Sequence, residues 1–124
     1  MKKFIAFMVV CALGLFGCSS TSLPDGVSQT FYDNGKAVVE IMDDYFANDV
    51  TAAKAADKVQ KVLDKLSKED VSDSIDNESI LNVISKIQSN LSYVSEADES
   101  EVDSVNTDLE IATNGLRTAL GLND

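Results

Sequence analysis

The sequence predicts an all-α protein, a small up-down bundle of four helices that follows an apolar leader and a short polar tether. In four successive stretches after residue 27, apolar residues recur at alternating spacings of three and four. This spacing places them on one face of a helix, and no stretch shows the sustained alternation of a strand. The only proline, Pro24, precedes all four stretches, so no proline interrupts a helix.

Residues 1–17 have the pattern of a signal peptide. Lys2 and Lys3 supply a positive start, and residues 4–16 form an apolar run interrupted only by Gly14. A helix that crosses a bilayer needs about 20 residues, so this run fits the hydrophobic region of a signal peptide better. A transmembrane anchor that is retained uncleaved and a site for the conventional signal peptidase are the alternatives.

Leu15-Phe16-Gly17-Cys18 resembles a bacterial lipobox, with an aliphatic residue at −3, a small residue at −1 and then the cysteine. The resemblance covers residues 1–18 and implies a bacterial lipoprotein, in which residues 1–17 are removed and Cys18 carries fatty acids such as palmitate. It further implies a body outside the cytoplasm, held at the cell membrane or the outer membrane. Lipoproteins retained at the inner membrane of a diderm cell carry an aspartate after the cysteine. Ser19 stands at that position here, so in a diderm cell the resemblance implies the outer membrane. The resemblance implies no fold or activity for the body.

The lipobox accounts for both cysteines of the chain. Cys11 leaves with the leader and Cys18 is linked to lipid, so the mature body has no thiol. We therefore expect no disulfide, no zinc cluster and no cysteine nucleophile, and a body that its core alone must hold together.

Residues 18–26 are predicted to be the lipidated cysteine and a flexible tether. Residues 19–22 are small and polar. Leu23-Pro24-Asp25-Gly26 is typical of a turn, with proline at the second position and glycine at the fourth. About eight residues at ~3.5 Å each reach about 28 Å, so the body is expected to stay near the membrane.

Residues 27–124 are predicted to form the bundle. The helices are too short and too rich in Ser, Asn and Asp to be stable alone, so their apolar faces must bury one another, at crossing angles of about 20°. A slender hairpin that dimerises is the alternative. The expected core faces are Phe31, Gly35, Val38, Met42 and Tyr45; Ala52, Ala56, Val59, Leu63 and Leu66; Ile80, Ile84, Ile87, Leu91 and Val94; and Val102, Val105, Leu109, Ala112 and Leu116.

Capping residues predict where the helices begin. The candidates are Asp49 or Thr51 for the second helix, Asp76 or Asn77 for the third, and Ser100 with Asp103 as a capping box for the fourth.

Two dipeptides allow other structures. Asn34-Gly35 is a hairpin signal that would pair residues 27–32 with residues 36–41 as strands. Asn114-Gly115 would end the fourth helix early.

The charge excludes some partners. The chain has 10 basic and 21 acidic residues, a formal charge of −11. Without Lys2 and Lys3 the mature chain has 8 basic and 21 acidic residues, or −13. Such a body repels phosphate backbones, so nucleic-acid binding is not expected. The chain has no His, which removes the commonest general base and transition-metal ligand.

Five of the eight mature cations form one stripe on the second predicted helix, beside its apolar face. They are Lys54, Lys58, Lys61, Lys65 and Lys68. The stripe is a candidate face for anionic lipid or for an acidic partner. The alternative is a solvated face, balanced by Asp57–Lys61 and Asp64–Lys68 pairs.

No motif predicts a metal site. The run of oxygen-bearing residues from Asp70 to Glu78 resembles a calcium loop, but Ile75 replaces its glycine at position six and Leu81 its glutamate at position twelve. The acidic run from Glu96 to Asp103 fails in the same way.

No motif predicts catalysis either. A serine nucleophile would lack a histidine base, Asp43 and Asp44 do not share a helix face, and there is no glycine-rich phosphate loop. We therefore expect no enzyme, and no cofactor besides the covalent lipid on Cys18. The helix-spaced aromatics are expected in the core, with a ligand pocket as the alternative; they are Phe31, Tyr32, Tyr45, Phe46 and Tyr93.

The sequence thus predicts a membrane-anchored envelope lipoprotein whose body is a non-catalytic binding or structural module with an envelope protein as a candidate partner. A small inhibitor, immunity or exclusion factor acting on an envelope or phage protein is the alternative, followed by a ligand-binding bundle. An exposed apolar patch beyond the main faces would favour a partner, and the candidates for it are Val39, Ile41, Leu81 and Ile111.

Overall fold

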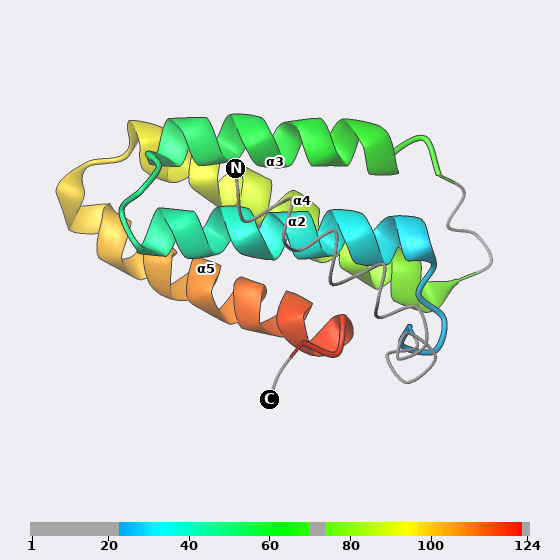
Figure 1. Ribbon diagram of the computed structural model, residues 1–124. Coiled ribbons are helices and arrows are strands. Elements are labelled where there is room, and N and C mark those ends of the chain that lie inside the picture. The colour runs from blue at the N-terminus through cyan, green and yellow to red at the C-terminus, as the bar shows by residue number, and fades with distance from the viewer. Residues whose placement is uncertain (1–22, 70–73, 123–124) are drawn as a thin grey trace, which may run out of the picture.

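The computed structural model describes residues 23–69 and 74–122, which form an up-down bundle of four α-helices (Figure 1). The helices are α2 (Gln29–Phe46), α3 (Ala52–Leu66), α4 (Ile75–Glu96) and α5 (Glu99–Ala119). No strand occurs in these two ranges. The predicted all-α, four-helix architecture is confirmed, whereas the leader and Cys18 lie outside the described residues. In the described part, no helix is both long and apolar enough to cross a bilayer.

Both alternative readings of the Asn-Gly dipeptides are wrong. α2 continues through Asn34-Gly35, and α5 continues through Asn114-Gly115 to Ala119. In α2 the glycine serves packing, because a Cβ at Gly35 would lie 2.9 Å from Cδ1 of Leu120. Leu120 follows α5 and is buried. The missing side chain therefore lets the end of α5 approach α2 closely.

The bundle has two distinct ends (Figure 1). The start of α2, the end of α3, the start of α4 and the end of α5 meet at one end, which we call the tether end because the chain enters there. The α2–α3 and α4–α5 connections lie at the other, the loop end. α3 packs against α2 and α4, α5 packs mainly against α4, and α2 also contacts α4 and α5.

The core follows the predicted faces closely in α2 and α4 and less closely in α3. Fourteen of the twenty predicted core positions are buried. Outside α3, the exceptions are Tyr45, Val94, Val102 and Val105, which are half-buried at the margins of their faces. On α3 the deepest positions include Ala55 and Val62, whereas the predicted Ala52 and Leu63 are half-buried. α3 therefore presents a face turned slightly from the predicted one, because it packs against two helices.

Polar groups inside the bundle have partners. Thr113 is buried and donates its hydroxyl to the Leu109 carbonyl at 2.7 Å. Tyr45 donates its hydroxyl to Asn106 Oδ1 at 2.6 Å, which joins α2 to α5. Burial raises the pKa of Tyr45, and the hydrogen-bonding Asn106 side chain offsets only part of that rise. Among the described residues, every buried side-chain nitrogen or oxygen has a hydrogen-bond partner.

Two glycine substitutions test the close approach of α5 to α2. Alanine in a helix interior is favoured over glycine by about 1 kcal/mol. A Cβ at Gly115 meets no atom within 4 Å, so Gly115→Ala should raise the free energy of unfolding by about that amount. Gly35→Ala should instead lower it by about 1 kcal/mol, because overpacking against Leu120 outweighs the propensity gain. Urea denaturation measures both; equal stabilisation by the two variants would contradict this packing.

Candidate functional site

The chain enters the bundle through a turn that belongs to the body. The Val27 amide donates to the Pro24 carbonyl at 3.1 Å, so the turn spans residues 24–27, one residue later than predicted. Gly26 is its third residue and has a φ of +83°, a conformation that glycine adopts without strain. Val27 is buried and begins the core.

The first turn of α4 holds this entry turn in place. The Ser74 hydroxyl donates to the Gly26 carbonyl, and the Ser28 amide donates to Asn77 Oδ1 at 3.2 Å. A Cβ at Gly26 would overlap the Asp76 carboxylate, so only glycine fits at this point. These contacts join residues far apart in sequence across the tether end.

Docking of the entry turn shortens the tether. The prediction counted residues 19–26 as free chain, but Gly26 and Ser28 are bonded to α4. That leaves residues 19–23 between Cys18 and the entry turn. Five residues extend about 18 Å at most, at ~3.5 Å each, compared with about 28 Å for eight. A lipid on Cys18 would therefore hold the tether end closer to the membrane than the sequence suggests.

The helix caps match the prediction only in α3. Thr51 caps α3, as predicted, and its hydroxyl accepts from the Lys54 amide at 3.2 Å. The prediction of Asp76 or Asn77 for α4 is wrong, because Ser74 is the cap and accepts from the Asn77 amide at 3.1 Å. The Asn77 side chain is directed instead to Ser28 across the tether end.

The predicted capping box of α5 is also wrong. The helix begins at Glu99 after Asp98, so Ser100 lies inside its first turn, and Asp98 makes no side-chain capping bond. Glu99 and Glu101 in that turn are placed where a helix favours negative charge. Glu101 also accepts the Tyr93 hydroxyl at 2.7 Å, and this acceptor raises the pKa of Tyr93.

The five predicted lysines form a continuous exposed strip along α3 and its C-terminal end, which we call the lysine face. Its members are Lys54, Lys58, Lys61, Lys65 and Lys68, and all five are exposed. Within the described ranges, none of them lies within 4.0 Å of a carboxylate oxygen. The Asp57–Lys61 and Asp64–Lys68 pairs of the alternative reading are not formed. Asp64 Oδ1 accepts instead from Gln60 Nε2 at 3.0 Å.

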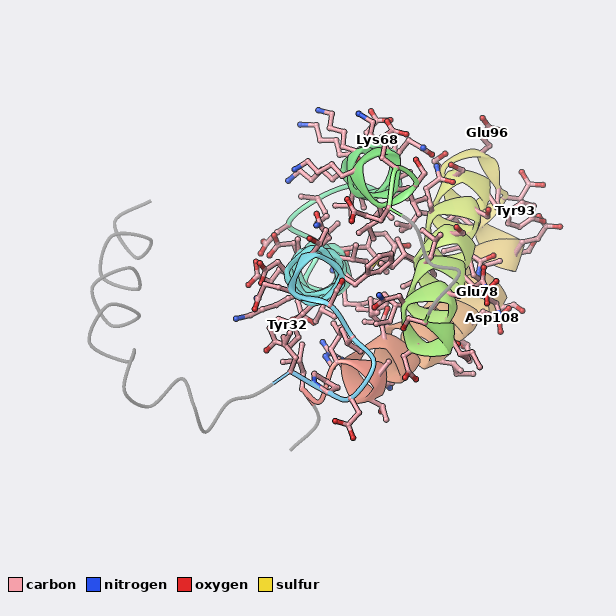
Figure 2. The ribbon with its side chains drawn as sticks, turned by 90° about the vertical axis from the view of Figure 1, so that its right-hand side faces the viewer. Tyr32, Lys68, Glu78, Tyr93, Glu96 and Asp108 are labelled. Carbon is pink, nitrogen blue, oxygen red and sulfur yellow. The ribbon has the colours of Figure 1, made fainter. Side chains whose placement is uncertain are left out.

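The lysine face lies on a body that is otherwise anionic. Residues 51–68 hold five lysines and two aspartates, whereas residues 74–122 hold nine acidic and two basic residues. Figure 2 shows Lys68 at α3 and Glu96 and Asp108 on another side of the bundle, at α4 and α5. Charge is therefore segregated by helix, with α3 as the cationic element.

An ion pair joins α5 to α2, two of the helices with net negative charge. Arg117 of α5 contacts the Asp43 carboxylate of α2, and its guanidinium also donates to Asn114 Oδ1 at 3.0 Å. Asp43 is thus engaged in holding α5 against α2.

The predicted aromatic set does not form one buried cluster. Phe31 is in the core, Tyr32 and Tyr45 are half-buried, and Phe46 and Tyr93 are 37% and 48% exposed. Phe46 and Tyr93 lie near the loop end, close to the last residues of α2 and α4.

The candidate apolar patch also separates. Val39 is buried, because α2 contacts all three other helices, and Ile41 and Leu81 pack against the core. Only Ile111 of these four residues is exposed, at 65%. The four candidates therefore do not form an exposed apolar patch together.

The described residues of the two acidic runs are not grouped as metal ligands. Ser74 caps α4, and Asp76 and Glu78 lie in its first turn. Asp70 and Ser72 lie outside the described residues. Across residues 23–69 and 74–122, no three His, Cys, Asp or Glu side chains are grouped so that they could hold a metal ion.

Comparison of the chain with protein-family models, with curated proteins and with solved structures gives no match. The features that bear on function are therefore the lipobox-like sequence, the docked entry turn and the lysine face.

One serine substitution and one aspartate substitution test the docking of the entry turn. Ser74→Ala removes both the cap of α4 and the hydrogen bond to Gly26, so it should lower the free energy of unfolding by about 2 kcal/mol. Asp98→Ala is the matched control, because that cap makes no side-chain hydrogen bond, and it should cost less than about 1 kcal/mol. Denaturation with urea measures both, and equal losses would show that Ser74 is no more than an ordinary cap residue.

Proposed function

We propose that the protein is a lipid-anchored envelope lipoprotein whose helical body acts by contact, as a binding or structural module, and catalyses no reaction. The observation that carries the proposal is the spacing between two features. Cys18 ends a lipobox-like sequence, and the docked entry turn begins only six residues later, at Pro24. A lipid on Cys18 would thus be attached almost directly to the tether end.

The contacts at the tether end of the body support an anchored role. The first and last residues of its buried apolar cluster in the sequence are Val27, just before α2, and Leu120, just after α5. The start of α2 and the end of α5 both lie at the tether end. The entry turn is bonded to α4, and Leu120 packs over Gly35 of α2. A force on the tether would therefore act on α2, α4 and α5 together and not on one terminal segment alone.

The composition of the body supports a role without catalysis. Residues 19–124 contain neither His nor Cys. Burial raises the pKa of Tyr45, and the Glu101 carboxylate raises the pKa of Tyr93, so both side chains favour the neutral phenol. A raised tyrosine pKa moves these groups away from proton transfer near neutral pH. Contact with a partner then takes place through surface residues, and the exposed Phe46 and Tyr93 offer aromatic contacts at the loop end, away from the anchor.

The anchor is tested with the two cysteines of the chain. Cys18→Ser should abolish incorporation of labelled fatty acid and leave an unprocessed precursor, because the acylated thiol is gone. Cys11→Ser is the matched control, since it removes a leader thiol and leaves residues 15–18 unchanged. Fatty-acid labelling and membrane fractionation in bacterial cells provide the measurement.

Crosslinking in the same cells tests the contact role. The unsubstituted protein and Cys11→Ser should give adducts with an envelope component, and Cys18→Ser should give none. Normal acylation and processing of Cys18→Ser would contradict the anchor. Adducts that persist undiminished in Cys18→Ser would show that contact does not depend on it.

A further inference from the structure

The lysine face is the one described surface on which an anionic partner would meet attraction. Residues 51–68 carry a formal charge of +3, from five lysines and two aspartates, whereas α2, α4 and α5 each carry more acidic than basic residues. In the described ranges no carboxylate within 4.0 Å neutralises the five ammonium groups. Like charges on the other helices repel an anionic surface, so electrostatics selects α3 for contact.

The shape of the lysine face fits an extended surface better than a small anion. Steps of four and three residues place the lysines in line along one side of α3. Within α3, Lys54 and Lys65 are eleven residues apart, or about 17 Å at 1.5 Å per residue, and Lys68 follows just after the helix. A single phosphate would contact one or two of these side chains, whereas the headgroups of a bilayer form a flat array that all five can reach.

The tether brings the lysine face within reach of such an array. α3 packs against α2, the helix that follows the entry turn, and α3 ends at the tether end, where that turn lies. Residues 19–23 extend about 18 Å at most. Fully extended, these five residues are therefore about as long as the lysine face, so an anchored body can lie with α3 against the bilayer.

We infer that the lysine face binds the anionic lipid surface in which the protein is anchored, with α3 parallel to the bilayer plane and with α4 and α5 directed away. This inference rests on the proposed lipid anchor. Each lysine near an anionic membrane contributes about 1 kcal/mol, so a line of five is enough to fix the orientation of a body that the lipid already holds there.

The neighbouring helix sets the depth of this contact. Asp33, Glu40 and Asp44 of α2 are exposed, so α2 is repelled by anionic headgroups. No large apolar side chain is exposed on α3. The contact is therefore electrostatic and superficial, and it depends on salt, because the screening length falls from about 10 Å at 0.1 M to about 3 Å at 1 M salt.

The experiment uses the full lipidated protein on phosphatidylcholine vesicles with and without phosphatidylglycerol. Amine-reactive labelling followed by mass spectrometry gives a rate for each lysine, and flotation of the vesicles reports anchoring separately. On anionic vesicles, labelling of the five lysines should be slower by about threefold or more than on neutral vesicles, because about 1 kcal/mol per lysine corresponds to about a fivefold effect. The exposed Lys86 of α4 is the internal control and should keep its rate.

A matched pair of variants tests whether the charge causes the protection. Substitution of Lys58, Lys61 and Lys65 by glutamine should remove the protection of Lys54 and Lys68, and Lys86→Gln should leave it intact. All of these positions are exposed, and circular dichroism checks that the helices are retained. Protection should also disappear at 1 M salt.

The outcomes separate the anchor from the orientation. Equal labelling on both kinds of vesicle, with the protein floating, would overturn the lipid-facing inference and leave the anchor standing. Failure to float would overturn the anchor. Protection in bacterial cells but not on anionic vesicles would also overturn the inference, and it would assign the lysine face to an acidic protein partner.

Discussion

Burial of four amphipathic helix faces is the constraint on which the structure depends. Helices of 15 to 22 residues with Ser, Asn and Asp inside them are not stable alone in water. No cysteine follows Cys18, so no disulfide holds the body together. Stability must therefore come from the apolar cluster between Val27 and Leu120. α4 is central to that cluster because it packs extensively against α3 and α5 and also contacts α2. Gly35 of α2 allows the end of α5 to approach α2.

The fold was predictable from the sequence because a helical face needs only a spacing rule. The spacing located α4 and its core residues Ile80, Ile84, Ile87 and Leu91 correctly. It placed the face of α3 less well, since alanines and valines on both sides of the stripe give no sharp boundary. Packing between α2 and α4 decided in favour of Ala55 and Val62.

The failures share a physical cause, which is contact between distant segments. Ser74, Asp76 and Asn77 are all good caps in isolation, and the selection of Ser74 follows from its hydrogen bond to Gly26. For the same reason the docked entry turn was not foreseen, and the tether seemed longer than it is. The exposure of the lysine face was predicted, because lysines beside an apolar stripe remain in solvent. The absence of Asp57–Lys61 and Asp64–Lys68 pairs was not foreseen, because spacing alone does not decide whether two exposed side chains pair.

Core, entry turn and charge together define one geometry. The core makes the body a rigid unit, and the entry turn fixes the point at which the tether leaves it. The segregation of charge gives that unit one cationic side, on α3. The proposed lipid at Cys18 would hold this unit near a membrane, where a modest cationic surface would be enough to orient it. The acidic helices and the loop end would then be presented to the envelope.

Neutron reflectometry of the lipidated protein on a supported anionic bilayer tests this geometry most directly. α4 has 22 residues and is about 33 Å long at 1.5 Å per residue, whereas two layers of helices measure about 20 Å across. The account predicts a protein layer about 20 Å thick in contact with the headgroups. A layer of about 33 Å or more, or a layer separated from the headgroups by a water gap, would contradict it.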